Sequence, residues 1–283
     1  MKRLYCIPAL ILLYHSDSFS AGWGQNHSGT VVLEGSINVM GTTSPVWLWK
    51  SGIKHTEFNR EIKTGEKTLS VFMREDVPLL LGKTKEAFDK AGRGSRAVPV
   101  IEFFDADNVP VEISWISGSQ GEGIIFLPVD DATTPGRRIG KVNIYTKAFG
   151  ALALTEYGYD EDARIIQTAG DNTNNAYVFN GGVMGMNSWK TKDGMDYIAR
   201  MSSDTVTAQD IWQQLKNKTP LIPGSPVFSN ESSFNDLLGD GFLYAGAYAL
   251  GIPKGNKMDL IFDHQITDIT RWKSLLTVKI TYL

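Results

Sequence analysis

Amide, carboxylate and aromatic side chains gather between residues 171 and 193. The residues concerned are Asp171, Asn172, Asn174, Asn175, Tyr177, Trp189, Lys190 and Asp193. A sugar ring is bound by an aromatic face against its apolar side and by fixed amide or carboxylate groups at its hydroxyls, usually on loops of a rigid scaffold. We therefore favour four carbohydrate-binding candidates, Asp171, Asn174, Tyr177 and Trp189. For each of them the alternative is a turn residue or a buried aromatic.

The histidine positions give no sign of a catalytic centre. Beyond the N-terminal segment the chain has His27, His55 and His264, which are scattered and lack ligand spacing. The sequence contains no H-E-x-x-H or G-x-S-x-G pattern, no pair of cysteines and no glycine loop that could cradle a phosphate. Since catalysis needs titratable groups that converge, we expect neither an enzyme nor a cofactor.

Two acidic clusters are the remaining candidates for metal chemistry. Asp160, Glu161 and Asp162 are consecutive, and Asp105 and Asp107 lie in a DADN segment. Such carboxylates can bind Ca²⁺, but neither cluster has the regular spacing and terminal glutamate of an EF-hand loop. We expect solvated turns and no metal site.

Residues 1–21 have the layout of a secretory signal peptide. Lys2 and Arg3 give a positive start, and an apolar run of about 11 residues follows from Leu4 to Tyr14. This run is too short to span a bilayer, and small residues follow it up to Ala21. We expect cleavage here and a mature chain that starts near Gly22.

Charge and cysteine content narrow the class of protein further. Without the leader the chain has 26 basic and 30 acidic residues, with no long run of one sign. This balance does not favour binding to nucleic acid or to an anionic membrane. The single cysteine, Cys6, lies in the leader, so the mature core must hold without disulfides.

Short apolar segments separated by turn residues recur about every ten residues in the first half of the chain. This spacing, in a sequence with 28 Gly and 11 Pro, predicts a mainly β sandwich or barrel. The expected strands are Thr30–Val39, Val46–Lys50, Thr68–Met73, Val98–Phe103, Val111–Ile116, Gly123–Leu127 and Val142–Thr146. The pattern returns at Gly246–Leu250, at Met258–Phe262 and in the C-terminal segment.

Residues 147–240 differ in character from the β blocks on either side. They carry the polar stretches GYDEDAR, AGDNTNNAY and NGG, and one segment with a convincing helical period, TAQDIWQQLK. There Thr207 can cap a helix, Asp210 follows three residues later, and Ile211 and Leu215 are one turn apart. We expect an insertion with short helices, carried between two strands of the sandwich.

The first mature stretch, GTVVLEGSINV, alternates in the manner of a strand. Val31, Leu33, Gly35, Ile37 and Val39 lie on one face, and a glycine inside a strand weakens it unless another backbone comes close. The stretch is either an ordinary first strand with a bulge or an extension that adds as a strand to another copy. Burial of its four apolar side chains would contribute roughly 6 to 12 kcal/mol, against about 5 to 15 kcal/mol for the stability of a whole domain.

The last nine residues, LLTVKITYL, read as a half-buried strand that runs to the end of the sequence. Leu276, Val278, Ile280 and Tyr282 fall on one side of a two-residue period. A chain end inside a strand is unusual, because most termini are poorly ordered.

Taken together, these features resemble the pilins of chaperone-usher fimbriae. The shared features are a leader, a mature chain without disulfides, an alternating extension with a central glycine, and a terminal strand with a penultimate tyrosine. The stretches PLLLGKTKEAF (Pro78–Phe88) and AGAYALGI (Ala245–Ile252), with GTVVLEGSI and LTVKITYL, are similar to the FaeG-like major fimbrial subunits and adhesins of enterotoxigenic enteric bacteria. The resemblance covers nearly the whole mature chain and is weakest in the insertion.

This resemblance implies an incomplete immunoglobulin-like sandwich that cannot close its own interior. A periplasmic chaperone would hold it and an outer-membrane usher would polymerise it into a cell-surface fimbrium of identical subunits. The donor strand of one subunit would fill the groove of the next, with Val31, Leu33, Gly35, Ile37 and Val39. The chaperone would bind the last strand through Leu276, Val278, Ile280 and Tyr282 and through the carboxylate of Leu283.

The resemblance also implies that the insertion binds a host glycoconjugate. The expected division of the chain is 1–21 leader, 22–40 donor extension, 41–146 first part of the sandwich, 147–240 insertion and 241–283 last strands. Two alternatives stay open: a purely structural shaft subunit without its own glycan site, and a self-contained periplasmic lectin or hydrolase that folds without a partner.

Overall fold

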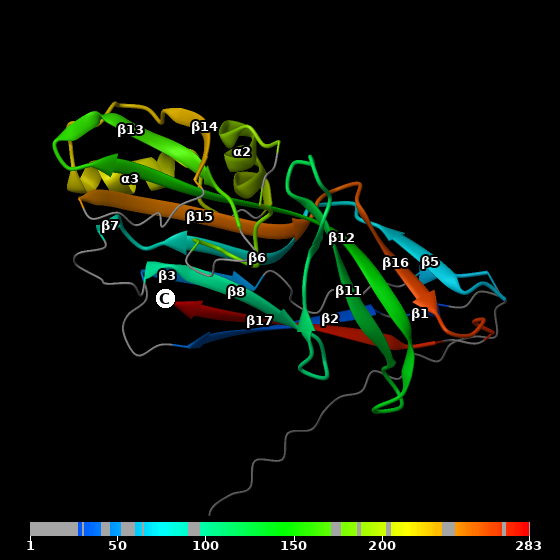
Figure 1. Cartoon of the computed structure of the whole chain (residues 1–283). Helices are drawn as coiled ribbons and strands as arrows, with labels where there is room; N and C mark the ends of the chain where they lie inside the picture. The colour runs from blue at the N-terminus through cyan, green and yellow to red at the C-terminus, as the bar shows by residue number, and fades with distance from the viewer. Residues whose placement is uncertain are drawn as a thin grey trace, which may run out of the picture.

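A computed structural model shows a protein built mainly of β-strands (Figure 1). The described residues are 28–29, 31–40, 46–51, 60–63, 65–89, 97–170, 177–185, 188–201, 205–233, 241–267 and 270–282. Within them the helices are α2 (Thr191–Met201) and α3 (Ala208–Lys218). The prediction of a mainly β sandwich with short helices is confirmed.

The strands divide into a short pair and one large, strongly bent sheet. The short pair is β1 (Ser28–Gly29) with β4 (Arg60–Glu61). The strands of the large sheet are β2 (Val31–Met40), β3 (Trp47–Ser51), β5 (Thr68–Phe72), β6 (Val77–Thr84), β7 (Phe88–Asp89), β8 (Pro99–Phe104), β9 (Pro110–Val111), β10 (Ser114–Trp115), β11 (Glu122–Asp131), β12 (Arg138–Glu156), β13 (Tyr159–Thr168), β14 (Phe228–Ser233), β15 (Phe242–Ile252), β16 (Lys257–Phe262) and β17 (Trp272–Tyr282).

The long strand β12 joins the two halves of the molecule. Its first half pairs with β11 and β16, and its second half pairs with β13 and β15. The sandwich and the region that we predicted as an insertion therefore share this strand. The predicted boundary at Lys147 falls in the middle of β12.

Three layers result from this arrangement, because β15 presents a different kind of side chain on each face. Tyr244, Tyr248 and Leu250 enter the core between the two layers of the sandwich, where they meet residues of β8 and β17 such as Ile101 and Leu276. Small side chains, Ala245, Ala247 and Ala249, face the other way and pack under α2 and α3. Alanines on this face let the helices approach the sheet closely.

Helix α3 begins where the sequence predicts. Thr207 is the N-cap, its side chain accepts from the backbone N–H of Asp210, and the Asp210 carboxylate accepts from the backbone N–H of Thr207. This reciprocal arrangement is a capping box. Ile211 and Leu215 lie on the buried side of the helix, as their spacing predicts.

Helix α2 was not predicted, because Gly194 near its start lowers the helix propensity of the segment. The glycine is needed for packing, since a Cβ at this position would overlap the ring of Phe149. Strand β6 was not predicted either. Its run Leu79–Leu81 is buried on both faces and therefore does not alternate.

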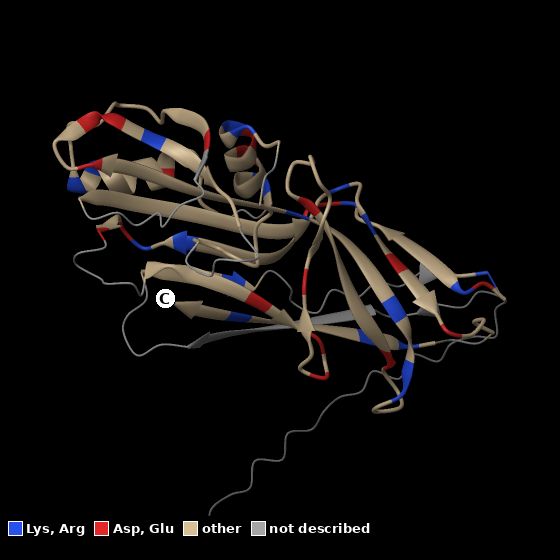
Figure 2. Cartoon of the chain, viewed as in Figure 1, with Lys and Arg blue, Asp and Glu red and all other residues tan. Residues whose placement is uncertain are grey.

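The expected turns between strands are present at both predicted places. The backbone N–H of Asn108 donates to the carbonyl of Asp105 (3.1 Å), and that of Arg137 donates to Thr134 (3.2 Å). Figure 2 shows acidic and basic residues interspersed along the described elements, in keeping with a sequence that has no long run of one charge.

Candidate functional site

Strand β17 supplies a row of side chains to the core of the sandwich. Trp272, Ser274, Leu276, Val278 and Ile280 are buried, and the residues between them are partly or fully exposed. The two-residue period read from the sequence is therefore present in the folded strand. It extends further toward the N-terminus than predicted, to Trp272.

The two edges of β17 are occupied in different ways. On one edge, β8 pairs antiparallel with Thr277–Tyr282 and β11 pairs with the first residues of the strand. On the other edge, β2 runs parallel along ten residues, from Val31 opposite Trp272 to Met40 opposite Thr281. Among the described strands β2 pairs with no other, although some of its residues also come near β3.

One side-chain hydrogen bond joins β3 to β17, the two strands beside β2. The indole Nε1 of Trp49 donates to the hydroxyl oxygen of Tyr282 at 2.8 Å. Burial raises the pKa of Tyr282 to about 12, and the hydrogen bond from Trp49 opposes this shift only in part. Tyr282, at the end of β17, is thus held to β3.

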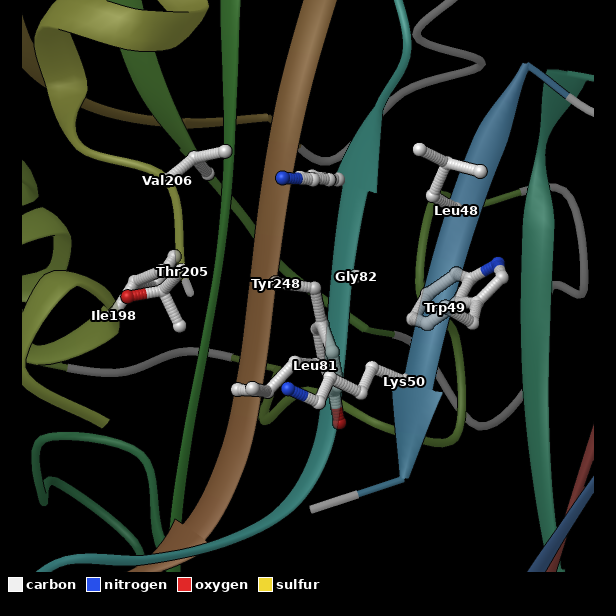
Figure 3. Close-up of a pocket in the computed structure, with 10 residues that line it drawn as sticks. Leu48, Trp49, Lys50, Leu81, Gly82, Ile198, Thr205, Val206 and Tyr248 are labelled. Atoms are coloured by element: carbon white, nitrogen blue, oxygen red, sulfur yellow. The ribbon is translucent and has the colours of Figure 1, made fainter. Parts of the chain in front are cut away.

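An aromatic cluster lies behind this bond and stiffens the core. The ring of Phe179 is 5.0 Å from the rings of both Trp47 and Tyr248, and Trp49 is 5.8 Å from Tyr248. These centroid distances are in the range of favourable aromatic pairs. Gly82 makes room for the cluster, because a Cβ there would overlap the ring of Trp49 (Figure 3).

A cavity of about 160 Å³ lies at the same place, between β3, β6 and the end of α2 (Figure 3). Its wall is mostly apolar, with Leu48, Leu81, Ile198 and Val206, and it also includes Lys83. This lining suits a small hydrocarbon group. It lacks the convergent acid and base groups that a reaction would need.

A more polar pocket of about 200 Å³ lies at the other end of β15. Tyr157, in the turn after β12, is 51% exposed, and its hydroxyl donates to a carboxylate oxygen of Asp89 at 2.9 Å. Burial together with the neighbouring Asp89 raises the pKa of this hydroxyl. Lys218, at the end of α3, forms a 3.4 Å ion pair with Glu86 in the same pocket. The pocket thus places an accessible aromatic ring beside carboxylates and an ammonium group.

Metal ligands and membrane helices are not found in the described part of the chain. None of its His, Cys, Asp and Glu side chains form a group of three or more that could hold a metal ion. None of its helices is both long and apolar enough to cross a membrane.

Comparison with known proteins decides the family. A family model described as "Fimbrial, major and minor subunit", of the K88 type, matches residues 1–283. The chain belongs to the K88 fimbrial family. Among curated relatives from Escherichia coli, K88 fimbrial protein AD is 26% identical over 293 residues, and K88 fimbrial proteins AB and AC are each 25% identical. Each alignment covers 100% of this chain and 100% of the relative.

The protein is thus a fimbrial subunit, and the resemblance to major fimbrial subunits read from the sequence is confirmed. Fimbriae are fibres of many subunits at the cell surface. Members of this family are structural or adhesive subunits of fimbriae rather than catalysts.

The predicted donor residues Val31, Leu33, Gly35, Ile37 and Val39 all lie in β2. The structure places this strand along β17 of the same chain, with Gly35 opposite Leu276. We expected the donor strand to pair with β17 of another copy; in the single chain it pairs with β17 of the same copy. The physical reason is that an unpaired edge of β17 would leave a row of backbone groups and apolar side chains without partners.

The predicted chaperone-binding residues Leu276, Val278, Ile280 and Tyr282 lie together on β17, and Leu283 falls outside the described residues. Leu276, Val278 and Ile280 are buried and Tyr282 is partly buried. These residues form one continuous row, next to the edge that β2 occupies.

The predicted sugar-binding residues are not brought together by the described structure. Asp171 and Asn174 fall outside the described residues, and Tyr177 begins the turn that leads to Asn180. Trp189 is only 6% exposed, packs on Phe149 and donates its indole N–H to the carbonyl of Ala148 at 3.2 Å. A ring buried to this extent serves the core under the helices, so we do not carry Trp189 into the proposed site.

The pocket around Tyr157 was missed by the reasoning from sequence. Its residues come from segments near positions 88, 157, 218 and 243, which are far apart in the chain and meet only through the sheet. The sequence did contain a signal at residues 157–159, YGY, where two tyrosines flank a glycine turn at Gly158, with φ +84°.

Proposed function

We propose that this subunit polymerises by donor-strand exchange. In the fibre, β2 of one copy pairs with β17 of another copy and takes the place that the second copy's own β2 holds in the single chain. The observation that supports this is the isolation of β2: it is the first long strand, it forms a ten-residue ladder with β17, and it pairs with no other described strand.

The energetics favour a role for helper proteins in this exchange. A ladder between two chains would have much the same backbone pairs as the ladder within one chain. Burial of the four apolar residues of the donor stretch would contribute roughly 6 to 12 kcal/mol in the fibre. Closure within the chain has the advantage of a high effective concentration, on the order of millimolar for a short tether. A periplasmic chaperone that pairs with β17 would block this closure, and an outer-membrane usher would then exchange its strand for the β2 of the next subunit.

The last strand is suited to chaperone binding. Leu276, Val278 and Ile280 face the core in alternation, so a paired strand finds its register from the side chains and its affinity from the backbone. We propose that Tyr282 and the carboxylate of Leu283 complete this contact.

Removal of the extension tests donor-strand exchange against a protein that folds without a partner. We expect residues 41–283, expressed alone in the periplasm, to be insoluble, because β17 then has an unpaired edge. Residues 22–40 grafted after Leu283 through a flexible linker should restore soluble protein, measured as yield and as a cooperative urea transition. A soluble and stable truncated protein would favour the self-contained lectin instead.

We also propose that the subunit is an adhesin for a host-surface glycan. The pocket around Tyr157 supports this proposal, because it has an accessible aromatic ring beside charged groups. Asp171, Asn174 and Tyr177 stay candidates from the sequence. The alternative is a purely structural shaft subunit.

Two neighbouring tyrosines provide a matched test of the adhesin proposal. Tyr157 and Tyr159 are 51% and 53% exposed, but only Tyr157 lines the pocket and bonds Asp89. We expect fibres with Tyr157→Ala to lose most binding to a glycan array and to intestinal cells, and fibres with Tyr159→Ala to retain it. Unchanged binding by both variants would move the site elsewhere, and an absence of binding by unmodified fibres would favour the shaft subunit.

A further inference from the structure

A separate pocket of about 240 Å³ lies in the sandwich, along the outer edge of β8. It is bounded by β8 on one side, by β9 and β10 on another, and by the turn at Asn180 and Gly181. None of these elements contributes to the pocket around Tyr157. The NGG motif of the sequence, Asn180–Gly182, thus has a defined place in the fold.

The turn forms the end of the pocket because it docks on β8 where β9 stops. Strand β9 pairs only with Phe103 and Phe104, and further along the same edge the backbone N–H of Ile101 donates to the carbonyl of Asn180 at 2.9 Å. Gly181 has φ +81°, and a Cβ there would overlap the carbonyl oxygen of Ile101. A glycine is therefore required for this close approach. The space between the turn and β9 is left open as the pocket.

The pocket wall combines aromatic rings with hydrogen-bond acceptors. Phe104 and Trp115 line it and are partly exposed, and Glu102 and Glu112 add two carboxylates. Lys279, on β17, forms a 2.8 Å ion pair with Glu102 and lies 5.9 Å from the ring centroid of Phe104. The charge of Glu102 is therefore balanced by Lys279.

The wall also carries an unused donor. The indole nitrogens of Trp47 and Trp212 donate to backbone carbonyls at 2.9 and 2.8 Å. For Trp115, the hydrogen bonds of the described residues include no acceptor for the indole N–H, although Trp115 is partly buried. This N–H is not among the buried polar groups of the described residues that lack a partner, so it is accessible and can donate to a ligand.

We propose that this pocket binds one uncharged hexopyranose unit. A hydroxyl group both donates and accepts hydrogen bonds, and the pocket offers acceptors on Glu102 and Glu112 beside a donor on Trp115. The aromatic side chains suit the apolar face of the ring. Glu112, which forms no ion pair among the described residues, disfavours an acidic sugar by charge repulsion. A volume below the roughly 300 to 1,000 Å³ of drug-sized sites suits a single ring. This binding does not depend on the pocket around Tyr157.

The test is a titration of the mature full-length protein followed by the nuclear magnetic resonance signals of its indole N–H groups. The probes are methyl β-galactoside, methyl β-glucoside and N-acetylneuraminic acid, and the Trp115→Phe variant assigns the Trp115 signal. We expect this signal to shift with saturation for at least one neutral glycoside and at least about tenfold more weakly for the acidic sugar. No saturable shift with either neutral probe, or a stronger response to the acidic sugar, would overturn the proposal.

Two variants separate this pocket from the proposed adhesin site. Glu112→Gln removes one charged acceptor and should weaken the response of Trp115 to the neutral glycoside by about tenfold. Tyr157→Ala should leave that response unchanged. If Tyr157→Ala abolishes adhesion but the Trp115 signal does not respond to any neutral glycoside, the adhesin proposal stands and the proposal for this pocket fails. If the Trp115 signal responds but unmodified fibres do not adhere, this pocket binds a sugar and the adhesin proposal fails.

Discussion

Strands β15 and β2 are both long and both carry a central glycine, but the fold holds them differently. β15 pairs with β12 along one edge and with β6 and β7 along the other, and it is buried from Leu243 onward. Among the described strands β2 pairs with β17 alone, and it belongs to the N-terminal part of the chain. A strand held on both edges is part of the fold itself, whereas a terminal strand held on one edge can be supplied from outside.

The two glycines show the same contrast. A Cβ at Gly246 in β15 would overlap the ring of Trp47 and crowd the side chain of Leu152, so this glycine serves packing within the subunit. Gly35 in β2 lies opposite Leu276, at the middle of the one ladder that connects β2 to the protein. The first glycine concerns folding and the second concerns the strand that we propose is exchanged.

Leucine at position 35 should give the largest effect on fibres. We expect Gly35→Leu to stop fibre growth while chaperone-bound subunit still accumulates in the periplasm, because the chaperone strand, and not β2, pairs with β17 there. Electron microscopy of the cell surface and blots of periplasmic extracts measure the two outcomes.

Gly246→Val is the matched control for that variant. Overpacking against Trp47 should destabilise the subunit by about 1 to 3 kcal/mol whether or not it is in a fibre, seen as a lower urea midpoint of the mature protein. Normal fibres from Gly35→Leu would contradict the exchange of β2 between subunits. An unchanged urea midpoint for Gly246→Val would contradict the role of Gly246 in packing within the subunit.

A smaller effect is expected at the bond between Trp49 and Tyr282. Burial raises the pKa of Tyr282 from its ordinary value near 10 to about 12, so the unfolded chain loses this proton at lower pH than the folded one. The contribution of the protonated Tyr282 hydroxyl to the unfolding free energy is fully present below pH 10 and is lost as the pH rises toward 12. We expect the unfolding free energy of Tyr282→Phe to fall less over that interval than that of the unmodified protein.

Urea unfolding of both proteins at a series of pH values measures this difference. The buried Tyr197 and Tyr248 also have raised pKa values, but they are common to both proteins and cancel in the comparison. Parallel pH profiles for the two proteins would mean that Tyr282 is not held by the fold in this way.

Local patterns predicted several elements well. The alternation of β17 and the capping box at Thr207 are properties of short stretches, and both were readable before the fold was known. Helix α2 and strand β6 could not be predicted from local patterns. Gly194 and the apolar run of β6 are determined by packing against residues that are distant in sequence.

The candidate site was harder to predict for the same reason. Trp189 lies among sugar-binding residue types in the sequence, but the helices bury it. The pocket around Tyr157 is assembled from four distant segments. Whether β2 pairs with β17 of its own chain or of another copy depends on which proteins are present, so a local sequence pattern cannot predict it.

The central claim, that β2 changes partners in the fibre, can be tested by crosslinking. Ser36 lies opposite Thr277 in the middle of the ladder, and the mature chain has no cysteine of its own, because Cys6 lies in the expected leader. A subunit with Ser36→Cys and Thr277→Cys would be treated with a short bismaleimide, which reaches neighbouring residues whether β2 runs parallel or antiparallel. We predict crosslinks within single chains for free subunits and ladders of covalently joined subunits for fibres on a denaturing gel. Fibres whose cysteines are fully crosslinked but that still run as single subunits would contradict the account.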